Sequence, residues 1–369
     1  MAGYLDPADG IVVDASALQA WTLALVQQVG TPSDISADVA EVLLASDLRG
    51  IASHGTARLP QYMRLVTQGA MDPLARPTRE KSRPALARFN ANNGWGQHAA
   101  RIATDDALER ARELGVAISV VRNTNHYGIA GWYAMRIAQQ GLIGVSLTNA
   151  SPNVAPTRAR IGMLGTNPIA VAAPAGRFGM LVLDMATSTI PRGRIEVAAR
   201  RGEPIQAGWA IAPDGSSAST PEEALQGALL PLGGHEETGG YKGYGLALIV
   251  ELLTGILGDA AFGPNILGLF APQGRSNLGQ FFMAIDPAAL DDPDSFEARL
   301  ETLLTELTAA PLTPDAPGPV LFPGQPEAER AAYQAQRGIA LDRQHHEALL
   351  ALASTYRLPF PVTRSLQAA

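Results

Sequence analysis

The sequence predicts an α/β or α+β fold with an added helical part. Apolar residues recur at helical spacing near the N-terminus, and from about residue 99 helical segments alternate with short buried strands. The chain has 369 residues, a length that suits two domains better than one. We therefore expect residues 1–70, joined by residues 330–369, to form the helical part. Residues 71–329 would form the α/β part, which is long enough for two subdomains.

Two helices are predicted near the N-terminus. The first has apolar residues at positions 18, 21, 25 and 29, with Asp14 or Ser16 as its N-cap. The second covers about residues 36–48 and ends near Gly50. Residues 71–84 are rich in proline and charge, so we expect a connector there.

The remainder of the chain is predicted to alternate between helices and strands, with no internal repeat. Proline-rich loops and one amphipathic helix are expected in residues 271–318. Helices are predicted over residues 100–114, 129–140, 244–257, 296–307 and 342–353, and strands over residues 116–121, 142–147, 169–173 and 181–183.

Composition excludes several classes of protein. Hydrophobic residues make up 46% and charged residues 17%, which is typical of a folded protein rather than a disordered one. The absence of cysteine rules out disulfides, thiolate metal ligands and a cysteine nucleophile. A formal net charge of −7 argues against a nucleic-acid partner. The longest apolar run, residues 245–250, is too short to span a membrane, and residues 1–7 do not resemble a secretory signal, so we expect a cytoplasmic protein.

The usual dinucleotide-binding fingerprint is absent. No G-x-G-x-x-G follows a predicted strand, and the glycines of residues 240–245 have a different spacing. H-E-x-x-H, an acidic metal cluster and G-x-S-x-G are also absent, so metal-assisted or serine hydrolysis lacks its residues and no metal site is expected. A nicotinamide cofactor would therefore require a fold other than the common one.

Histidines are the first candidates for acid–base chemistry, because their pKa lies near neutrality. Of the six, His126 follows the predicted strand 116–121, at the end where α/β sheets bind ligands. His54 and Arg58 are four residues apart, which on a helix puts both on one face, where arginine suits a carboxylate. The competing interpretations are a histidine satisfied by loop backbone and a surface charge pair. His345 and His346 are expected to face solvent.

Two further segments could hold a cofactor. Asp184 follows the predicted strand 181–183 and could accept a hydrogen bond from a ribose hydroxyl, orient a histidine or cap the next turn. Lys242 lies in a glycine-rich loop ahead of a predicted helix, where exposed amides and a cation suit a pyrophosphate.

Ordered motifs along almost the whole chain resemble the malate/L-lactate dehydrogenase family, whose cofactor fold is distinct from the doubly wound one. This family also contains ureidoglycolate, sulfolactate and diketogulonate oxidoreductases and cyclic imino-acid reductases. The matching segments are residues 47–55 (DLRGIASHG) with Arg58, Pro60 and Tyr62; 125–131 (NHYGIAG); 164–170 (LGTNPIA); 184–188 (DMATS); 208–210 (GWA); 229–234 (LLPLGG); 242–246 (KGYGL); and 323–325 (PGQ).

The resemblance implies a homodimer that transfers a hydride between NAD or NADP and a carbon next to a carboxylate. In family terms, His126 is the catalytic acid and base. The residues that would grip the substrate are Ser53, His54, Arg58 and Tyr62, and those expected at the cofactor are Asp184, Met185, Ala186, Lys242, Gly324 and Gln325.

The substrate is expected to be a small 2-hydroxy or 2-oxo carboxylate of the malate or lactate type. The alternative is reduction of a cyclic imino acid such as pyrroline-2-carboxylate or piperideine-2-carboxylate. Members of that branch have an aspartate where this chain has Arg194, which favours the hydroxy acid. A non-catalytic dimeric binding protein is a third hypothesis. The choice between NAD and NADP, the side chain of the substrate and the physiological direction stay open.

Overall fold

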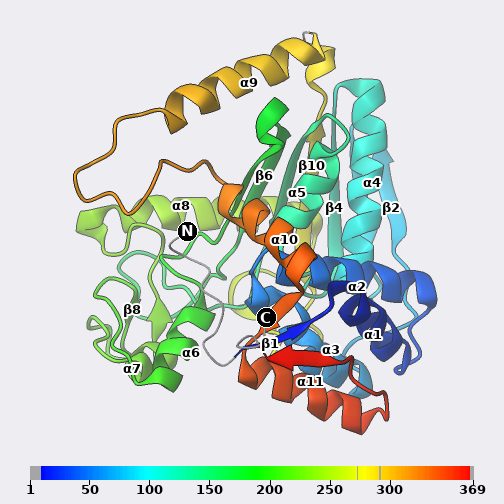
Figure 1. The fold of residues 1–369 in the computed structure, drawn as a ribbon, viewed down its shortest axis with the longest axis vertical. Coiled ribbons are helices and arrows are strands. Elements are labelled where there is room, and N and C mark those ends of the chain that lie inside the picture. The colour runs from blue at the N-terminus through cyan, green and yellow to red at the C-terminus, as the bar shows by residue number, and fades with distance from the viewer. Residues whose placement is uncertain (1–9, 272, 291, 366–369) are drawn as a thin grey trace.

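A seven-stranded mixed sheet forms the centre of the computed structural model, which describes residues 10–271, 273–290 and 292–365 (Figure 1). Only β3 and β4 are parallel neighbours, and the other neighbours are antiparallel. The predicted α/β class is confirmed. The strands, in spatial order, are β2 (Thr78–Arg83), β3 (Leu86–Asn90), β4 (Val116–Thr124), β10 (Leu278–Ile285), β5 (Ile143–Thr148), β6 (Ile169–Pro174) and β7 (Met180–Met185).

Two of these strands contradict the sequence prediction. β10 lies inside the sheet between β4 and β5, in a region expected to hold only loops and one helix. Its apolar run is interrupted at the start by Gly279 and by Gln280, which is fully buried although it is polar. β2 lies in the expected connector, and all of its side chains are exposed, so it has no apolar alternation to detect.

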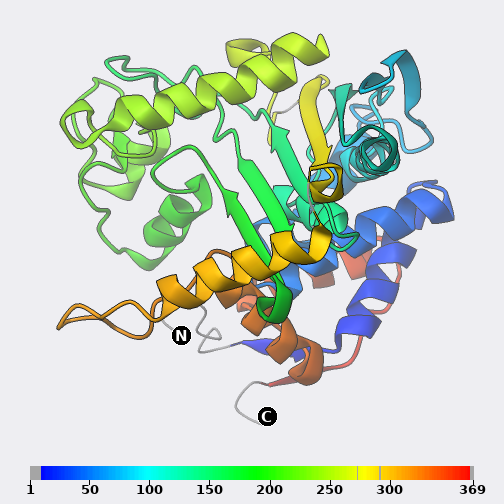
Figure 2. The same ribbon diagram turned by 90° about the horizontal axis from the view of Figure 1, so that it is seen from above.

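Helices cover both faces of the sheet. On one face lie α4 (Gly96–Leu114) and α5 (Ala130–Ala138). On the other lie α8 (Gly240–Glu251) and the π-helical segment η5 (Leu252–Ile256), which pack on Val120, Leu147 and Phe281. Figure 2 shows α8 on one side of the sheet and the N-terminal helices on the opposite side.

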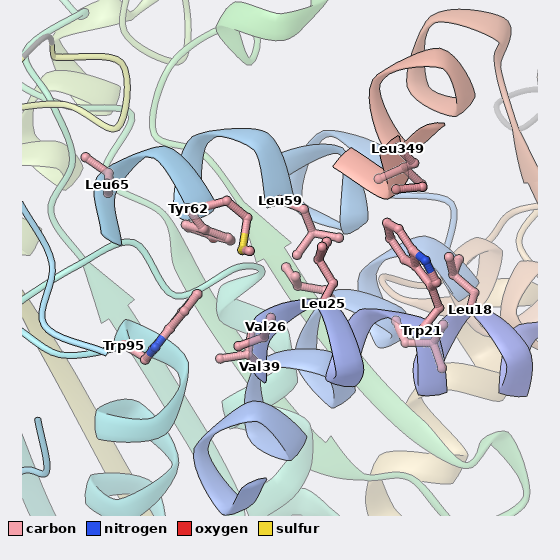
Figure 3. Close-up of a cluster of buried hydrophobic side chains, with 14 of the residues drawn as sticks. Leu18, Trp21, Leu25, Val26, Val39, Leu59, Tyr62, Leu65, Trp95 and Leu349 are labelled. Carbon is pink, nitrogen blue, oxygen red and sulfur yellow. The ribbon is translucent and has the colours of Figure 1, made fainter. Parts of the chain in front are cut away.

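Segments from both ends of the chain share one hydrophobic core (Figure 3). α1 (Ala15–Gln27), α2 (Ser33–Leu48), α3 (Leu59–Thr67) and α11 (Arg343–Thr355) contribute to it. Asp14 caps α1 as predicted, because its carboxylate accepts from the Ala17 N–H at 2.9 Å. A small sheet of β11 (Ile339–Leu341), β1 (Ile11–Val13) and β12 (Thr363–Ser365) also joins the two ends. On this basis we propose that residues 1–70 and 330–369 act as one helical part.

The remaining elements lie around the sheet. One small lobe has its own apolar core and contains α6 (Arg192–Arg201), α7 (Pro221–Gln226), β8 (Ala210–Ile211) and β9 (Ala228–Leu229). α9 (Pro293–Thr308) packs on η3 (Gly176–Phe178), and α10 (Gln325–Arg337) packs on α2. In the part of the chain that the structure describes, no helix is both long and apolar enough to cross a membrane. Residues 1–7, judged above for a secretory signal, lie outside the described residues.

Candidate active site

His126 lies in the loop that follows β4 and leads into α5, and its side chain is half-buried. The start of α4 packs closely against this loop. A Cβ on Gly96 would lie 2.2 Å from the Asn125 carbonyl oxygen and 2.5 Å from that of His126, so only glycine fits there. The buried Asn125 amide also donates to the Gly94 carbonyl at 2.8 Å. The loop is therefore held in one conformation by backbone packing.

The two ring nitrogens of His126 have different surroundings. Nδ1 lies 2.6 Å from the hydroxyl of Tyr62 and accepts the Gly128 N–H at 3.3 Å. Among the described residues, no group hydrogen-bonds to Nε2. Nε2 is thus the nitrogen left for a substrate. Tyr62 is only 1% exposed, and its hydroxyl is the partner of Nδ1; its expected contact with the substrate stays a prediction.

His54 lies beside His126, with ring centroids 5.5 Å apart and ring planes 28° apart. The four-residue spacing predicted that His54 and Arg58 share one face of a helix. In the structure they do not share a helix. The segment consists of two short 3₁₀ turns, η1 (Ala52–His54) and η2 (Thr56–Arg58), which are separated at Gly55. The cause is Asp47, whose carboxylate accepts the Thr56 N–H at 2.9 Å and lies where a Cβ on Gly55 would be.

Arg58 is held from two sides. Its Nε donates to the Ser53 carbonyl at 2.5 Å, and its guanidinium lies 5.3 Å from the centre of the Phe270 ring. No carboxylate among the described residues pairs with it. Ser53 is exposed, and its hydroxyl lies 2.9 Å from His54 Nδ1. The fork of Arg58 therefore retains donors for an external anion.

Electrostatics keep both imidazoles neutral at neutral pH. Burial lowers the pKa of His126 well below its usual value, and positive charge on His54 and Arg58 lowers it further. Burial, with Arg58, lowers the pKa of His54 to about 4. An anion bound at Arg58 would offset this positive charge and raise both pKa values, so the site favours a substrate that carries a carboxylate.

The expectation that His345 faces solvent is wrong. Its side chain is 6% exposed, and Nε2 lies 3.0 Å from the Thr56 hydroxyl, which donates to Asp47 at 2.6 Å. α11 thereby supports the turn that carries His54 and Arg58. His346 is partly exposed and packs on Phe360 at 5.3 Å between ring centroids. Sequence reasoning missed the contribution of Asp47 and Thr56, although Asp47 begins the first motif.

Asp184, expected at the cofactor, caps a helix. Its Oδ2 accepts the Gly131 N–H at 2.8 Å in the first turn of α5, and a Cβ on Gly131 would lie 2.7 Å from that oxygen. Of the roles considered for Asp184, the structure therefore shows capping, but of α5 rather than of the next turn. The side chain stays exposed, and Met185 and Ala186 follow it in half-buried positions.

The turn of residues 323–325 lies against β7, close to Asp184. Val182 donates to the Pro323 carbonyl at 3.0 Å, and a Cβ on Gly324 would lie 2.7 Å from that of Val182. Gly324 has a φ of +89°, so this approach suits glycine alone. Gln325 donates to Glu329 at 2.8 Å. The structure thus brings together two segments that are distant in the sequence.

Lys242 lies in the first turn of α8, exposed, with its ammonium 5.9 Å from the Tyr241 ring centre. It has no ion pair among the described residues. Fewer loop amides are available than expected, because Gly240 and Lys242 donate theirs to loop carbonyls at 2.9 Å. This turn packs on Leu232, which donates to Thr187 at 2.9 Å, so Lys242 is near the segment that follows Asp184.

The sequence is similar to those of one family of known proteins. The sequence model described as malate/L-lactate dehydrogenase matches residues 13–350. A malate dehydrogenase from Pyrococcus abyssi is 39% identical over 85% of this chain and 86% of its own length. An L-sulfolactate dehydrogenase from Methanothermobacter thermautotrophicus is 36% identical over 89% of this chain and 92% of its own.

Solved structures agree with the sequence matches. The malate dehydrogenase of Pyrococcus horikoshii superimposes with a TM-score of 0.90 at 32% identity, over 97% of this chain and 99% of that one. A Δ1-piperideine-2-carboxylate reductase from Pseudomonas syringae gives a TM-score of 0.82 at 31% identity, over 93% of this chain and 99% of that one. A sulfolactate dehydrogenase from Chromohalobacter salexigens, named as NADP(+)-dependent, is 33% identical over 77% of this chain. A ureidoglycolate dehydrogenase from Escherichia coli, named as NAD(+)-dependent, is 33% identical over 85% of this chain.

Proposed function

The chain belongs to the malate/L-lactate dehydrogenase family, and from this premise we propose that it transfers a hydride between NAD or NADP and a small 2-hydroxy or 2-oxo carboxylate. The observation that carries the proposal is an imidazole in the same site as a guanidinium that pairs with no carboxylate among the described residues. His126 keeps Nε2 unbonded among the described residues, and the charge of Arg58 acts on that ring. This combination suits a substrate whose reacting carbon is next to a carboxylate.

We propose three roles in the reaction. Arg58 binds the carboxylate with its planar fork, and His54 with Ser53 lines the same side. Nε2 of His126 takes the hydroxyl proton during oxidation and returns it to the carbonyl oxygen during reduction. Holding the substrate in one orientation supplies a further rate gain. When bound, the nicotinamide accepts or supplies the hydride.

The residues around β7 fit a dinucleotide. The exposed carboxylate of Asp184 can accept from a ribose hydroxyl, and the ammonium of Lys242, which lacks an ion pair within the described ranges, can bind a phosphate. At Gly324 the backbone approaches Val182 of β7 at a point where no Cβ fits, so the turn of residues 323–325 lies against the strand that carries Asp184 and Met185. These contacts support the proposed cofactor site.

A substrate panel tests the proposal. Purified protein is mixed with oxaloacetate, pyruvate, other 2-oxo acids or pyrroline-2-carboxylate, each with NADH and with NADPH. We expect turnover of at least one 2-oxo acid, and a loss of kcat/KM of about 100-fold or more in His126→Ala. His346→Ala, which removes a histidine of α11 outside the site, should retain activity. Near-normal turnover in His126→Ala would rule out the mechanism.

A cyclic imino acid is the second candidate substrate, supported by the similarity to the piperideine-2-carboxylate reductase. The charge of the site argues against it. The start of α6 borders the substrate turn, since a Cβ on Gly193 would lie 4.0 Å from that of Ser53, and α6 carries the exposed Arg194. Positive charge disfavours a protonated imine. Turnover of the imine alone, with no 2-oxo acid, would reverse the assignment.

We also propose a cytoplasmic homodimer. The chain has no cysteine and needs a nicotinamide cofactor, as expected in a reducing compartment. α8 and η5 expose leucine and isoleucine side chains that a second copy could cover.

A further inference from the structure

We infer that Tyr62 is a positioning residue that sets which nitrogen of His126 carries the proton. The inference rests on the proposed function, because it assigns a task within the same site. Tyr62 comes from α3 and lies among the core side chains shown in Figure 3, with its ring 5.9 Å from that of Trp95 in an edge-to-face contact. Its hydroxyl ends 2.6 Å from Nδ1 of His126. Because the Tyr62 side chain is buried, we expect it to affect the reaction through its hydrogen bond to the His126 imidazole.

The direction of these hydrogen bonds follows from the second partner of Nδ1. The backbone N–H of Gly128 points at the same nitrogen at 3.3 Å, and an N–H can only donate. Nδ1 is therefore the acceptor in the resting site, and Tyr62 donates its proton to it. A neutral imidazole has one N–H, so that proton is on Nε2, facing the substrate. This tautomer donates to a carbonyl oxygen.

The oxidation direction needs the other tautomer. To take a proton at Nε2, His126 must carry its own proton on Nδ1, and Tyr62 must then accept from Nδ1–H and donate elsewhere. Gln97 on α4 is fully buried and, among the described residues, its amide makes no hydrogen bond of normal geometry, although it lies close enough to the Tyr62 hydroxyl to lower the pKa of that group. Burial raises the pKa of the Tyr62 phenol, whereas Arg58 and Gln97 oppose this. The hydroxyl therefore stays protonated and can turn from Nδ1 towards Gln97.

The proton count balances with this rotation. During reduction, His126 first takes one proton from solvent at Nδ1; the carbonyl carbon then gains a hydride, and its oxygen gains the Nε2 proton of the charged ring. The neutral ring that remains keeps its proton on Nδ1, and Nδ1–H donates a hydrogen bond to the Tyr62 hydroxyl oxygen. During oxidation the same ring receives the hydroxyl proton at Nε2. The titratable and charged groups that face His126 are His54 of η1, Arg58 of η2 and Tyr62 of α3.

Tyr62→Phe tests the inference, because phenylalanine keeps the ring in the core and removes only the hydroxyl. We expect kcat to fall about 10- to 100-fold while the KM of the 2-oxo acid changes less than about twofold. The charged imidazole loses an acceptor for Nδ1–H, so its pKa falls. Reduction needs the protonated ring, so the alkaline limb of the pH profile for reduction should move to lower pH. The matched control is Tyr127→Phe. This removes another buried hydroxyl, 3.2 Å from Ser146, on the residue next to His126, and should change neither quantity.

A second measurement does not depend on turnover. The chain has six histidines, so ¹⁵N NMR of histidine-labelled protein, assigned with His126→Gln, can report the tautomer directly. We expect the wild type to hold its proton on Nε2, and Tyr62→Phe to shift towards a mixture. A higher KM with unchanged kcat in Tyr62→Phe would make Tyr62 a substrate ligand and overturn the inference. An unchanged tautomer, or equal effects in Tyr127→Phe, would also overturn it. Failure of the proposed function would appear separately, as no turnover in the wild type.

Discussion

Arg58 is held by the Ser53 carbonyl and the Phe270 ring at the end of a segment that consists of two short turns. Its proximity to His54 in the sequence suggested a shared helix face, but Asp47 divides the segment at Gly55 into two turns. The contact between Arg58 and the ring of Phe270 could not be predicted, because no local pattern connects positions so far apart. The same holds for Tyr62 and His126, which are separated by 64 positions.

Arg58→Lys should weaken the binding of substrate. A lysine keeps the charge but loses the planar fork, the bond to the Ser53 carbonyl and the stacking on Phe270. Hydrogen bonds to charged groups contribute about 1.5–3 kcal/mol, so we expect KM for the carboxylate to rise roughly 10- to 100-fold, with a smaller change in kcat. Steady-state kinetics measure this. Arg112→Lys is the control, because Arg112 is exposed on α4 and donates a hydrogen bond to Gln140 at 2.8 Å. An unchanged KM would remove Arg58 from the substrate site.

At the scale of elements, most of the helices and strands near the site were predicted, because amphipathic spacing and buried apolar runs are local signals. β4 and α5, which position His126, match the prediction closely. The support from α11 was missed. His345 appears in a polar stretch of sequence, yet it is buried against Thr56, since tertiary packing decides which face of a helix is covered.

The buried His345 predicts a loss of stability in acid. Burial lowers its folded pKa to about 4, while its unfolded pKa is about 6.5. As the pH falls, the unfolded state therefore binds the proton first. The contribution of the neutral His345 to the free energy of unfolding is complete above pH 6.5 and is lost as the pH falls to about 4. The loss is at most about 3 kcal/mol.

His345→Gln should flatten this part of the stability curve, as measured by denaturant unfolding at pH 7.5 and pH 5. His346→Gln, at a partly exposed neighbour, should change the slope less. Asp47 acts in the opposite direction, because burial raises its pKa to about 7, so the comparison must be made against the wild type at each pH. Equal slopes in wild type and His345→Gln would contradict the assignment.

At the scale of the whole molecule, the proposed division into a helical part and an α/β part rests on where each pattern occurs along the chain. The order of strands could not be predicted, because β10 enters the middle of the sheet from a distant segment. The solvent-exposed face of α8 could not be predicted from the sequence either. α8 was predicted as a helix, but apolar residues occur on all of its sides, so its exposed face became visible only in the structure.

The exposed face of α8 and η5 carries a stripe of apolar side chains. Leu246, Ile249, Leu252 and Ile256 recur at three- and four-residue spacing along α8 and η5, and each is 40–50% exposed. A stripe of this kind is costly in water, so we expect a second copy to cover it. Ile249→Glu would place a carboxylate in that contact and should convert a dimer into a monomer, as measured by sedimentation equilibrium. Leu303→Glu, on an exposed face of α9, should keep the wild-type mass. A monomeric wild type, or a dimer that survives Ile249→Glu, would place the interface elsewhere or remove it.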